Sequence, residues 1–383
     1  MIKTLHIITG LSTGGAEMML YKIVSKSSSQ NTIVVSLTHN ETAPVAKKIA
    51  TLGVKIYFLN FHRSSFNLKK LGYLRKIIKK EMPDVIQGWM YHGNIVATFA
   101  VFFSFRKIPV VWNIRHSLHD IKKEKPLTRL VIRLNQFLSN SPKTIIYNSY
   151  VSADQHEGLG FQKTNRAIIP NGFDDGVFSP DETVRSTLRS QFKILEKEVL
   201  IGLVARYHPM KDHALFLQAA GQLILQYPDT KFMLIGKGVD NRSSDLVDLI
   251  HQYSLEEHVL LLGERTDIPM LTKVFDISTS SSSWGEGFSN AIGEAMASGV
   301  PCVVTNVGDS KLIVGKFGVV TEPNDMSGLM AGWIELIKMG REARLELGLE
   351  ARDHIQINYS LTAIANKYHA LYQQLASFSA KER

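Results

Sequence analysis

The sequence predicts an α/β protein made of two doubly wound, Rossmann-like domains in series. Its 383 residues exceed one ordinary compact domain and suffice for two. Short β-rich apolar runs alternate with segments of helical period, a pattern typical of parallel strands joined by crossover helices. The alternation restarts after a turn-rich stretch near residues 170–185. We therefore expect one domain at 1–175 and a second at 180–357.

The strands are predicted from apolar runs bounded by turn signals. In the first domain they are expected at 4–9, 32–37, 55–59, 84–87, 110–113 and 144–147. In the second they are expected at 200–205, 231–235, 259–262, 275–279 and 302–305. Ligands of open α/β sheets bind beyond the carboxyl ends of the strands, so two such domains would face each other across a cleft.

Composition narrows the classes of protein. The longest apolar run, residues 95–105, is too short to span a bilayer. The first residues lead into a polar glycine loop where a secretory signal would have a cleavage site, so no such signal is expected. The single cysteine, Cys302, excludes internal disulfides and is typical of a reducing cytoplasm. The only low-complexity tracts are the serines at 27–29 and 280–283.

Charge is divided unevenly along the chain. Residues 1–180 hold 24 Lys and Arg against 10 Asp and Glu, and the remainder holds 20 against 25, so the halves carry +14 and −5. This asymmetry indicates an anionic partner for the first domain. An anionic membrane surface is favoured over nucleic acid, because no recognised RNA- or DNA-binding module is present.

Two basic segments contribute to this charge. Residues 68–80 form a basic amphipathic pattern, which predicts either an ordinary helix packed on the sheet or a surface that also faces anionic lipid. Further cations of the same domain are Lys122, Lys123, Lys125, Arg129 and Arg133.

Two glutamates, Glu286 and Glu294, lie in the glycine-flanked segment 285–299. If Ser289 caps the following helix, Glu286 lies in the loop before it and Glu294 more than a turn inside. A fully helical segment would separate them by about 12 Å, close to the length of a sugar nucleotide. Glu294 falls among core-like residues, where a carboxylate needs a partner such as a ribose diol. A partly exposed position at the helix edge is the plainer alternative.

Other candidate residues also follow strands. Gly14 and Gly15 come after the first strand, where backbone N–H groups could meet an anion at a helix N-terminus, although a tight turn without ligand explains them equally well. Arg206 and Lys211 follow the first strand of the second domain and could clamp a diphosphate, or be solvated surface cations.

Histidines and metal ligands give a weaker signal. His116 and His119 follow the strand at 110–113 and should lie at the cleft. No HExxH, DxD or Cys/His cluster accompanies them, so no metal site is predicted.

Taken together, these residues resemble the retaining nucleotide-sugar glycosyltransferases of the GT-B fold, in particular the large family 4 group. The similarity covers almost the full chain and runs through Gly14-Gly15, the segments 170–174, 234–238 and 262–269, Arg206 with Lys211, and the Glu286/Glu294 pair. Lys237 stands where the family usually has an acidic residue between two glycines, a minor departure on a loop.

The resemblance implies roles for individual residues. Arg206 and Lys211 would hold the donor diphosphate and stabilise its charge as the glycosidic bond breaks. Glu286 would contact hydroxyls of the transferred sugar, Glu294 the ribose, and the backbone of Gly14 and Gly15 the donor phosphate or the acceptor. His116 matches the family histidine near the donor sugar, with His119 close enough to leave that assignment open. The remaining donor-binding residues implied are Gly236, Arg265, Gly287, Phe288 and Ser289.

The resemblance also implies the reaction. We expect a retaining glycosyltransferase without metal or other cofactor, transferring a sugar from a nucleotide donor, UDP-linked by preference, to a lipid-linked or glycan acceptor in surface polysaccharide or glycoconjugate assembly. It would work in the cytoplasm, peripherally at the inner face of the membrane, and its last helix, 359–378, would cross back to the first domain. The alternatives are a sugar-nucleotide epimerase or hydrolase of the same fold, and a non-catalytic protein that binds sugar nucleotides or polyanions.

Overall fold

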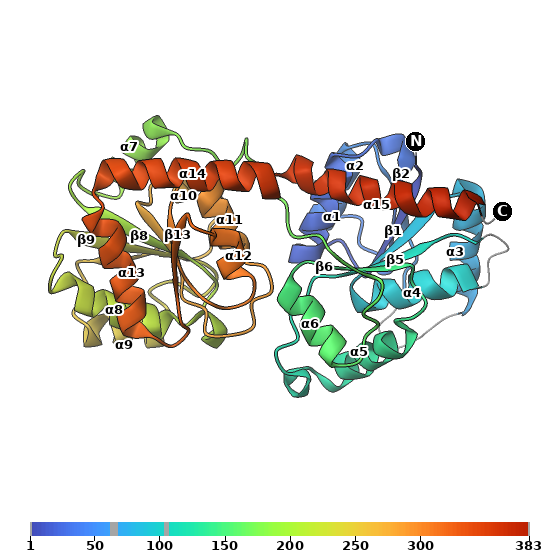
Figure 1. The fold of residues 1–383 in the computed structure, drawn as a ribbon, viewed down its shortest axis with the longest axis horizontal. Coiled ribbons are helices and arrows are strands. Elements are labelled where there is room, and N and C mark those ends of the chain that lie inside the picture. Colours follow the sequence, from blue (N-terminus) through green and yellow to red (C-terminus); the bar gives the residue numbers. More distant parts are fainter. Residues whose placement is uncertain (1, 62–67, 103–106, 382–383) are drawn as a thin grey trace. The chain divides into compact units, whose positions relative to one another are not determined.

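The structure is a computed structural model that describes residues 2–61, 68–102 and 107–381. The chain forms two compact units (Figure 1). Unit 1 comprises Met1–Gly172 with Leu361–Arg383, and unit 2 comprises Phe173–Ser360. The C-terminal helix thus belongs to the first unit, and the chain changes unit within the turn-rich stretch around residue 172.

Unit 1 is built on one sheet of seven parallel strands. Their order is β3-β2-β1-β4-β5-β6-β7, so β1 pairs with both β2 and β4. The strands are β1 (Thr4–Ile8), β2 (Thr32–Ser36), β3 (Lys55–Phe58), β4 (Val85–Trp89), β5 (Val110–Ile114), β6 (Thr144–Tyr147) and β7 (Arg166–Ile168).

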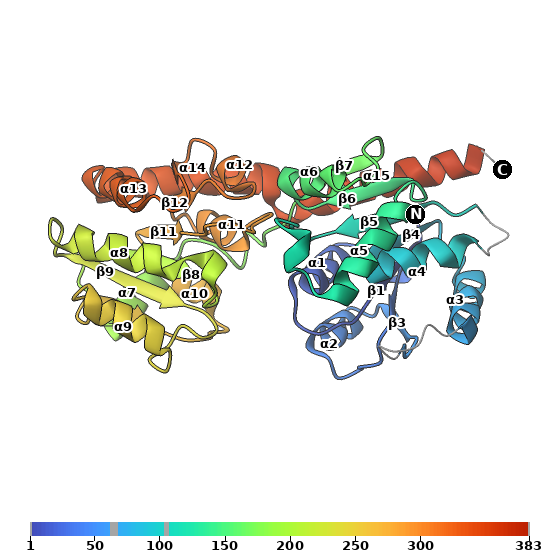
Figure 2. The same ribbon diagram turned by 90° about the horizontal axis from the view of Figure 1, so that it is seen from below.

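Helices cover both faces of this sheet, as parallel strands with crossover connections require (Figure 2). One apolar cluster lies under α1 (Gly15–Ser25), α2 (Pro44–Thr51) and α15 (Leu361–Lys381). The other lies under α3 (Leu68–Glu81), α4 (Met90–Phe102), α5 (Pro126–Leu138) and α6 (Tyr150–Gly158).

The basic helix α3 uses its apolar face for ordinary core packing. Leu71, Leu74 and Ile78 are buried in the cluster beneath it. For these three side chains the first of the two predictions, an ordinary helix packed on the sheet, is therefore correct. They are not available to a membrane.

Unit 2 repeats the same topology with six parallel strands. Their order is β10-β9-β8-β11-β12-β13. The strands are β8 (Val199–Val204), β9 (Thr230–Ile235), β10 (Val259–Leu261), β11 (Ile277–Ser280), β12 (Cys302–Thr305) and β13 (Gly318–Thr321). On one face lie α8 (His213–Ile224), α9 (Ser244–Gln252) and α13 (Met326–Lys338). On the other lie α7 (Glu182–Gln191), α10 (Ile268–Thr272), α11 (Asn290–Ala297), α12 (Ser310–Val314) and α14 (Arg341–Tyr359).

A buried ion cluster fastens α7 to this sheet. Asp276, just before β11, accepts from Arg185 at 2.8 Å and from Arg189 at 3.0 Å; both arginines are buried, and the Asp276 side chain is 9% exposed. The second oxygen of Asp276 also accepts from the backbone N–H of Leu200 in β8, at 2.8 Å. One carboxylate therefore joins a helix and two neighbouring strands.

The predicted fold class, two doubly wound Rossmann-like domains, is confirmed. Each predicted strand is present, with ends shifted by at most two residues. The sequence-based prediction omitted the two edge strands β7 and β13, of three and four residues. Within the described part of the chain, no helix is both long and apolar enough to cross a membrane.

Candidate functional site

The strand order of unit 2 places one pair of loops at the position where ligands of such sheets bind. From β8 the chain runs outward through β9 and β10, then returns to add β11 on the other side of β8. The loops after β8 and β11 therefore leave the sheet side by side at the topological switch point. These loops carry Lys211 and Glu286.

Lys211 and Glu286 meet at this switch point. The ammonium nitrogen of Lys211 contacts the Oε1 atom of Glu286, which also accepts from the hydroxyl of Ser282 at 2.8 Å. The Lys211 side chain keeps 19% of its surface exposed and the Glu286 side chain 10%. Lys211 and Glu286 are far apart in the sequence, and both were predicted as site residues. In the structure they form one ion pair that is largely buried but still reaches solvent.

The backbone that carries Lys211 is held by the loop after β11. The hydroxyl of Ser281 donates to the Lys211 carbonyl at 2.8 Å, and the N–H of Ser283 donates to the Met210 carbonyl at 2.9 Å. Asp212 follows with φ +48°, a left-handed conformation unusual for a residue with a side chain, and caps α8 by accepting from the N–H of Leu215. The serine run that looked like a low-complexity tract therefore fixes the position of the lysine.

Arg206 lies on the same loop, with an exposed side chain. Its neighbours are tied to the loop after β9, because Ala205 donates to Ile235 and Tyr207 donates to Lys237, each at 2.9 Å. Gly236 lies in that loop with φ +157°, and a Cβ atom on it would come within 2.0 Å of the Ala205 carbonyl oxygen. Glycine is required there because the two backbones touch.

We expect Gly236→Ala to displace the loop that carries Arg206. Backbone cannot yield as a side chain does, so the free energy of unfolding of unit 2 should fall by about 1–3 kcal/mol, and any activity that uses Arg206 should weaken with it. Urea unfolding and initial rates measure both. In the matched control Gly176→Ala, the nearest atom to the new Cβ would be at 3.4 Å, an ordinary contact. Equal unfolding energies for the two variants would contradict this account.

Glu294 projects from α11 and is half-buried, between the buried Gly293 and Ala295. A Cβ atom on Gly293 would overlap the ring of Phe173, which stacks on Phe288 at 6.0 Å. The helix and the loop before it are thus packed against one aromatic pair. The predicted capping by Ser289 is only half right: it occupies the N-cap position, but its side chain makes no capping hydrogen bond.

A second glycine shapes the loop around Glu286. Gly308 has φ +64°, and a Cβ atom there would come within 2.6 Å of the carbonyl oxygens of Glu286 and Gly287. The N–H of Asp309 donates to the Gly287 carbonyl at 2.9 Å. The loop after β12 therefore packs against the backbone of the predicted donor-binding segment and fixes its position.

Arg265, another predicted donor-binding residue, lies on the loop after β10, at the edge of the sheet. Its guanidinium makes two hydrogen bonds to the carboxylate of Asp267, at 2.8 and 2.6 Å. None of the described contacts joins it to Lys211 or Glu286. Arg265 therefore belongs to the rim of this region.

His213, directly after Asp212, is buried, and its ring meets that of Tyr207 edge-on at 5.4 Å. Burial lowers the pKa of His213 to about 4; the Ala205 carbonyl opposes this shift, and the positive charge of Lys211 adds to it. The neutral imidazole is therefore favoured in the folded state.

This pKa makes the stability of unit 2 depend on pH. In the unfolded state His213 has its ordinary pKa of 6.5, so it takes up a proton there at a higher pH than in the folded state. Neutral His213 therefore makes its full contribution to the free energy of unfolding above pH 6.5, and this contribution is lost as the pH falls from 6.5 towards 4. The loss should reach about 3 kcal/mol at most. Urea unfolding across this range should show a smaller slope for His213→Phe than for the wild type. The exposed His251, changed to Gln, is the control, and an unchanged slope in His213→Phe would refute the assignment.

In unit 1, Gly14 and Gly15 begin α1 at the switch point between β1 and β4. The carboxylate of Glu17 folds over this helix start, within 2.4 Å of where a Cβ atom of Gly14 would lie. Burial raises the pKa of Glu17. A carboxylate at a helix N-terminus interacts favourably with the helix dipole and disfavours a second anion at the same place.

His116 is held by a chain of hydrogen bonds on the same edge of the sheet. Its Nδ1 atom lies 3.2 Å from the hydroxyl of Tyr91, which lies 2.8 Å from Nε2 of His156. Nδ1 of His156 is 2.7 Å from the Ser152 carbonyl, which can only accept, so neutral His156 carries its proton there and Tyr91 donates to it. The Tyr91 oxygen then accepts from Nδ1 of His116, which leaves Nε2 of His116 as the basic atom.

The surroundings distinguish His116 from His119. Burial lowers the pKa of His116, while the Glu124 carboxylate, 3.5 Å from Nε2, opposes that effect. His119 is exposed. His116 is thus the more buried of the two histidines.

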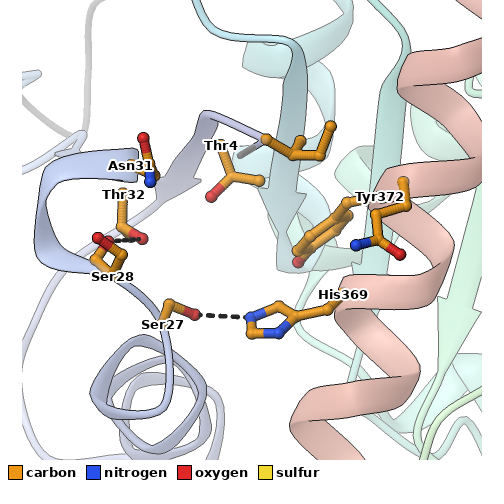
Figure 3. A pocket seen from close by; sticks show the side chains of 9 residues that line it. Thr4, Ser27, Ser28, Asn31, Thr32, His369 and Tyr372 are labelled. Atoms are coloured by element: carbon orange, nitrogen blue, oxygen red, sulfur yellow. Dashed lines mark hydrogen bonds between the residues drawn. The ribbon is translucent and has the colours of Figure 1, made fainter.

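A cavity of about 220 Å³ in unit 1 lies elsewhere (Figure 3). It is formed at the amino ends of β1 and β2, where Ser27 bonds to His369 at 3.1 Å. None of the predicted site residues lines it. Among the described residues, no group of three or more His, Cys, Asp or Glu side chains is placed to hold a metal ion.

Comparison with known proteins gives this arrangement a class. Two parallel sheets of the same strand order are the architecture of the GT-B glycosyltransferases. The structure of Anabaena Alr3699/HepE in complex with UDP has the same fold, with a TM-score of 0.84 and 20% identity over 97% of this chain and 100% of that one.

Two family models place the chain more closely. Residues 13–177 match Glycosyltransferase Family 4, and residues 198–339 match Glycosyl transferases group 1. The two matches cover successive parts of the chain, and the protein belongs to the family 4 glycosyltransferases.

Curated relatives agree with this family. The putative glycosyltransferase EpsF of Bacillus subtilis is 24% identical over 92% of this chain and 94% of its own length. The UDP-Gal:alpha-D-GlcNAc-diphosphoundecaprenol alpha-1,3-galactosyltransferase of Escherichia coli is 27% identical over 69% of each chain.

Proposed function

We propose that the protein transfers a sugar, with retention of configuration, from a UDP-sugar to a lipid-linked acceptor. The observation that carries the proposal is the meeting of Lys211 and Glu286 at the switch point of unit 2, with Arg206 on the same loop. Two relatives support the finer points. The E. coli enzyme is named for a UDP-sugar and a diphosphoundecaprenol acceptor, and the Anabaena protein was solved with UDP.

In this proposal unit 2 binds the donor. Arg206 and Lys211 hold the diphosphate, Glu294 the ribose and Glu286 the hydroxyls of the transferred sugar. The acceptor hydroxyl attacks the anomeric carbon on the face that the diphosphate leaves. The bond from that carbon to the phosphate oxygen breaks, its electron pair stays on the phosphate, and the phosphate takes the acceptor proton. The two cations stabilise the charge that develops on the leaving group.

Unit 1 would serve the acceptor and would place His116 near the transferred sugar. His116, fixed through Tyr91, presents Nε2 at the carboxyl edge of its sheet, and Gly14 and Gly15 lie on the same edge. The transfer needs no metal in this scheme, because the positive charge on the diphosphate comes from Arg206 and Lys211.

Incubation with a panel of UDP- and GDP-sugars and a membrane lipid extract tests the proposal. UDP should appear only when acceptor is present, and the product mass should equal acceptor plus sugar. The proton coupling constant at the anomeric carbon of the product reports retention. Free sugar without acceptor would indicate a hydrolase, an isomeric donor an epimerase, and tight donor binding without turnover a binding protein.

A further inference from the structure

One helix of unit 1 turns a row of large apolar side chains to solvent. In α5, Leu127, Leu130, Leu134 and Phe137 are 78, 66, 40 and 81% exposed. At 100° per residue they occupy an arc of about 80°, and they extend over about 15 Å of helix. Exposed apolar side chains are common singly, but an aligned row of four is typical of an interaction surface.

The orientation of α5 is fixed from its other side. Ile132 is buried in the core cluster of unit 1. Asn135, also buried, donates to the carbonyl of Tyr91 at 3.1 Å. The apolar row therefore cannot turn inward without breaking core contacts.

Positive charge borders the row. Residues 122–138 hold five cations against one acid, Glu124. Arg129 and Arg133 lie on the exposed side of the helix, on the arc next to the apolar row, and Lys122, Lys123 and Lys125 are exposed at its start. Apolar side chains beside clustered cations match the boundary between acyl chains and anionic headgroups, where cations are attracted to the negative charge of the lipid.

We infer that α5 lies in the surface of an anionic phospholipid bilayer, with the row from Leu127 to Phe137 inserted among the acyl chains. The inference rests on the proposed function, since a lipid-linked acceptor lies in the same surface. The contact between Glu124, just before α5, and His116 places the start of this helix beside a candidate site residue of unit 1. Helix α3, the other basic segment, presents no such row, because Leu71, Leu74 and Ile78 on its apolar face are buried.

The first test is sedimentation with phosphatidylethanolamine vesicles, with and without phosphatidylglycerol. Wild-type protein should bind the phosphatidylglycerol vesicles, less strongly as salt rises. The double variant Leu130→Glu/Phe137→Glu should bind at least about tenfold more weakly. The control Leu345→Glu/Leu349→Glu makes the same change at exposed leucines of α14 and should bind like the wild type. Equal binding by both variants overturns the inference, as does a wild-type dimer that the α5 variant abolishes.

A label reports insertion directly. Cys302 is buried, and burial raises the pKa of its thiol to about 12, so a cysteine introduced at the surface takes the label selectively. An environment-sensitive fluorophore on Phe137→Cys should shift to the blue on anionic vesicles and be quenched by spin-labelled acyl chains. The same fluorophore on Leu349→Cys should not respond. An unresponsive label at position 137 would contradict insertion.

Different results would refute the proposed function and the membrane role of α5. With acceptor dissolved in detergent, Leu130→Glu/Phe137→Glu should transfer sugar at the wild-type rate. A wild type that binds vesicles but never transfers sugar refutes the proposed function. A wild type that transfers sugar but binds vesicles no better than the variant refutes the role of α5.

Discussion

Replacement of Lys211 by alanine is expected to lower the rate of sugar transfer about 100-fold or more, as loss of one donor that stabilises transition-state charge does elsewhere. Arg206→Ala should have an effect of the same order. Because the stabilised charge develops as the glycosidic bond breaks, the loss should appear in kcat more than in KM. Initial rates with saturating acceptor and varied donor measure both constants.

Two further variants keep this prediction interpretable. Lys211→Ala leaves the buried carboxylate of Glu286 without its cation, which costs stability. In Lys211→Ala/Glu286→Gln that charge is removed, so folding should recover while transfer stays slow. Lys197→Ala, which removes an exposed lysine paired with Asp229, should leave the rate unchanged. Wild-type rates in the Lys211 variants would contradict the donor-binding role.

The largest effect on stability is expected from Asp276→Ala. It leaves the buried guanidinium groups of Arg185 and Arg189 without their carboxylate, and removal of one partner from a buried ion pair typically costs about 3–5 kcal/mol. The free energy of unfolding of unit 2 should fall by that amount. Unit 1 does not contain the cluster and should unfold as before.

Intrinsic fluorescence can separate the two units in urea. Trp89 and Trp112 lie in unit 1, and Trp284 and Trp333 in unit 2. A variant that keeps only the two tryptophans of one unit reports the unfolding of that unit. The control Asp229→Ala breaks an exposed pair, worth about 1 kcal/mol or less. Equal losses for the two aspartates would show that Asp276 does not hold α7 to the sheet.

The sequence predicted the fold because apolar periodicity and turn residues are local signals. It omitted β7 and β13 because each is an edge strand of only three or four residues, too short to be told from an apolar stretch of loop. The position of candidate residues after strands followed from the same signals. That Lys211 would touch Glu286 could not be predicted, since the contact depends on β11 lying next to β8, a pairing between distant segments.

Other features depend on which way a side chain points. The serines at 281–283 looked like a polar tract, yet their hydrogen bonds position Lys211 and Glu286. The sequence does not indicate the position of Glu17, because only the fold of the loop brings its carboxylate over Gly14. In α5 apolar residues occur on both sides of the helix, so the sequence alone could not show that Ile132 faces the core and Leu130 faces solvent.

The central claim is that a nucleotide diphosphate binds at the switch point of unit 2, and a crystal structure of the protein with UDP tests it most directly. The account predicts the diphosphate between Arg206 and Lys211 and the ribose beside Glu294. UDP bound at the Gly14 and Gly15 loop of unit 1, or bound away from both cations, would contradict it.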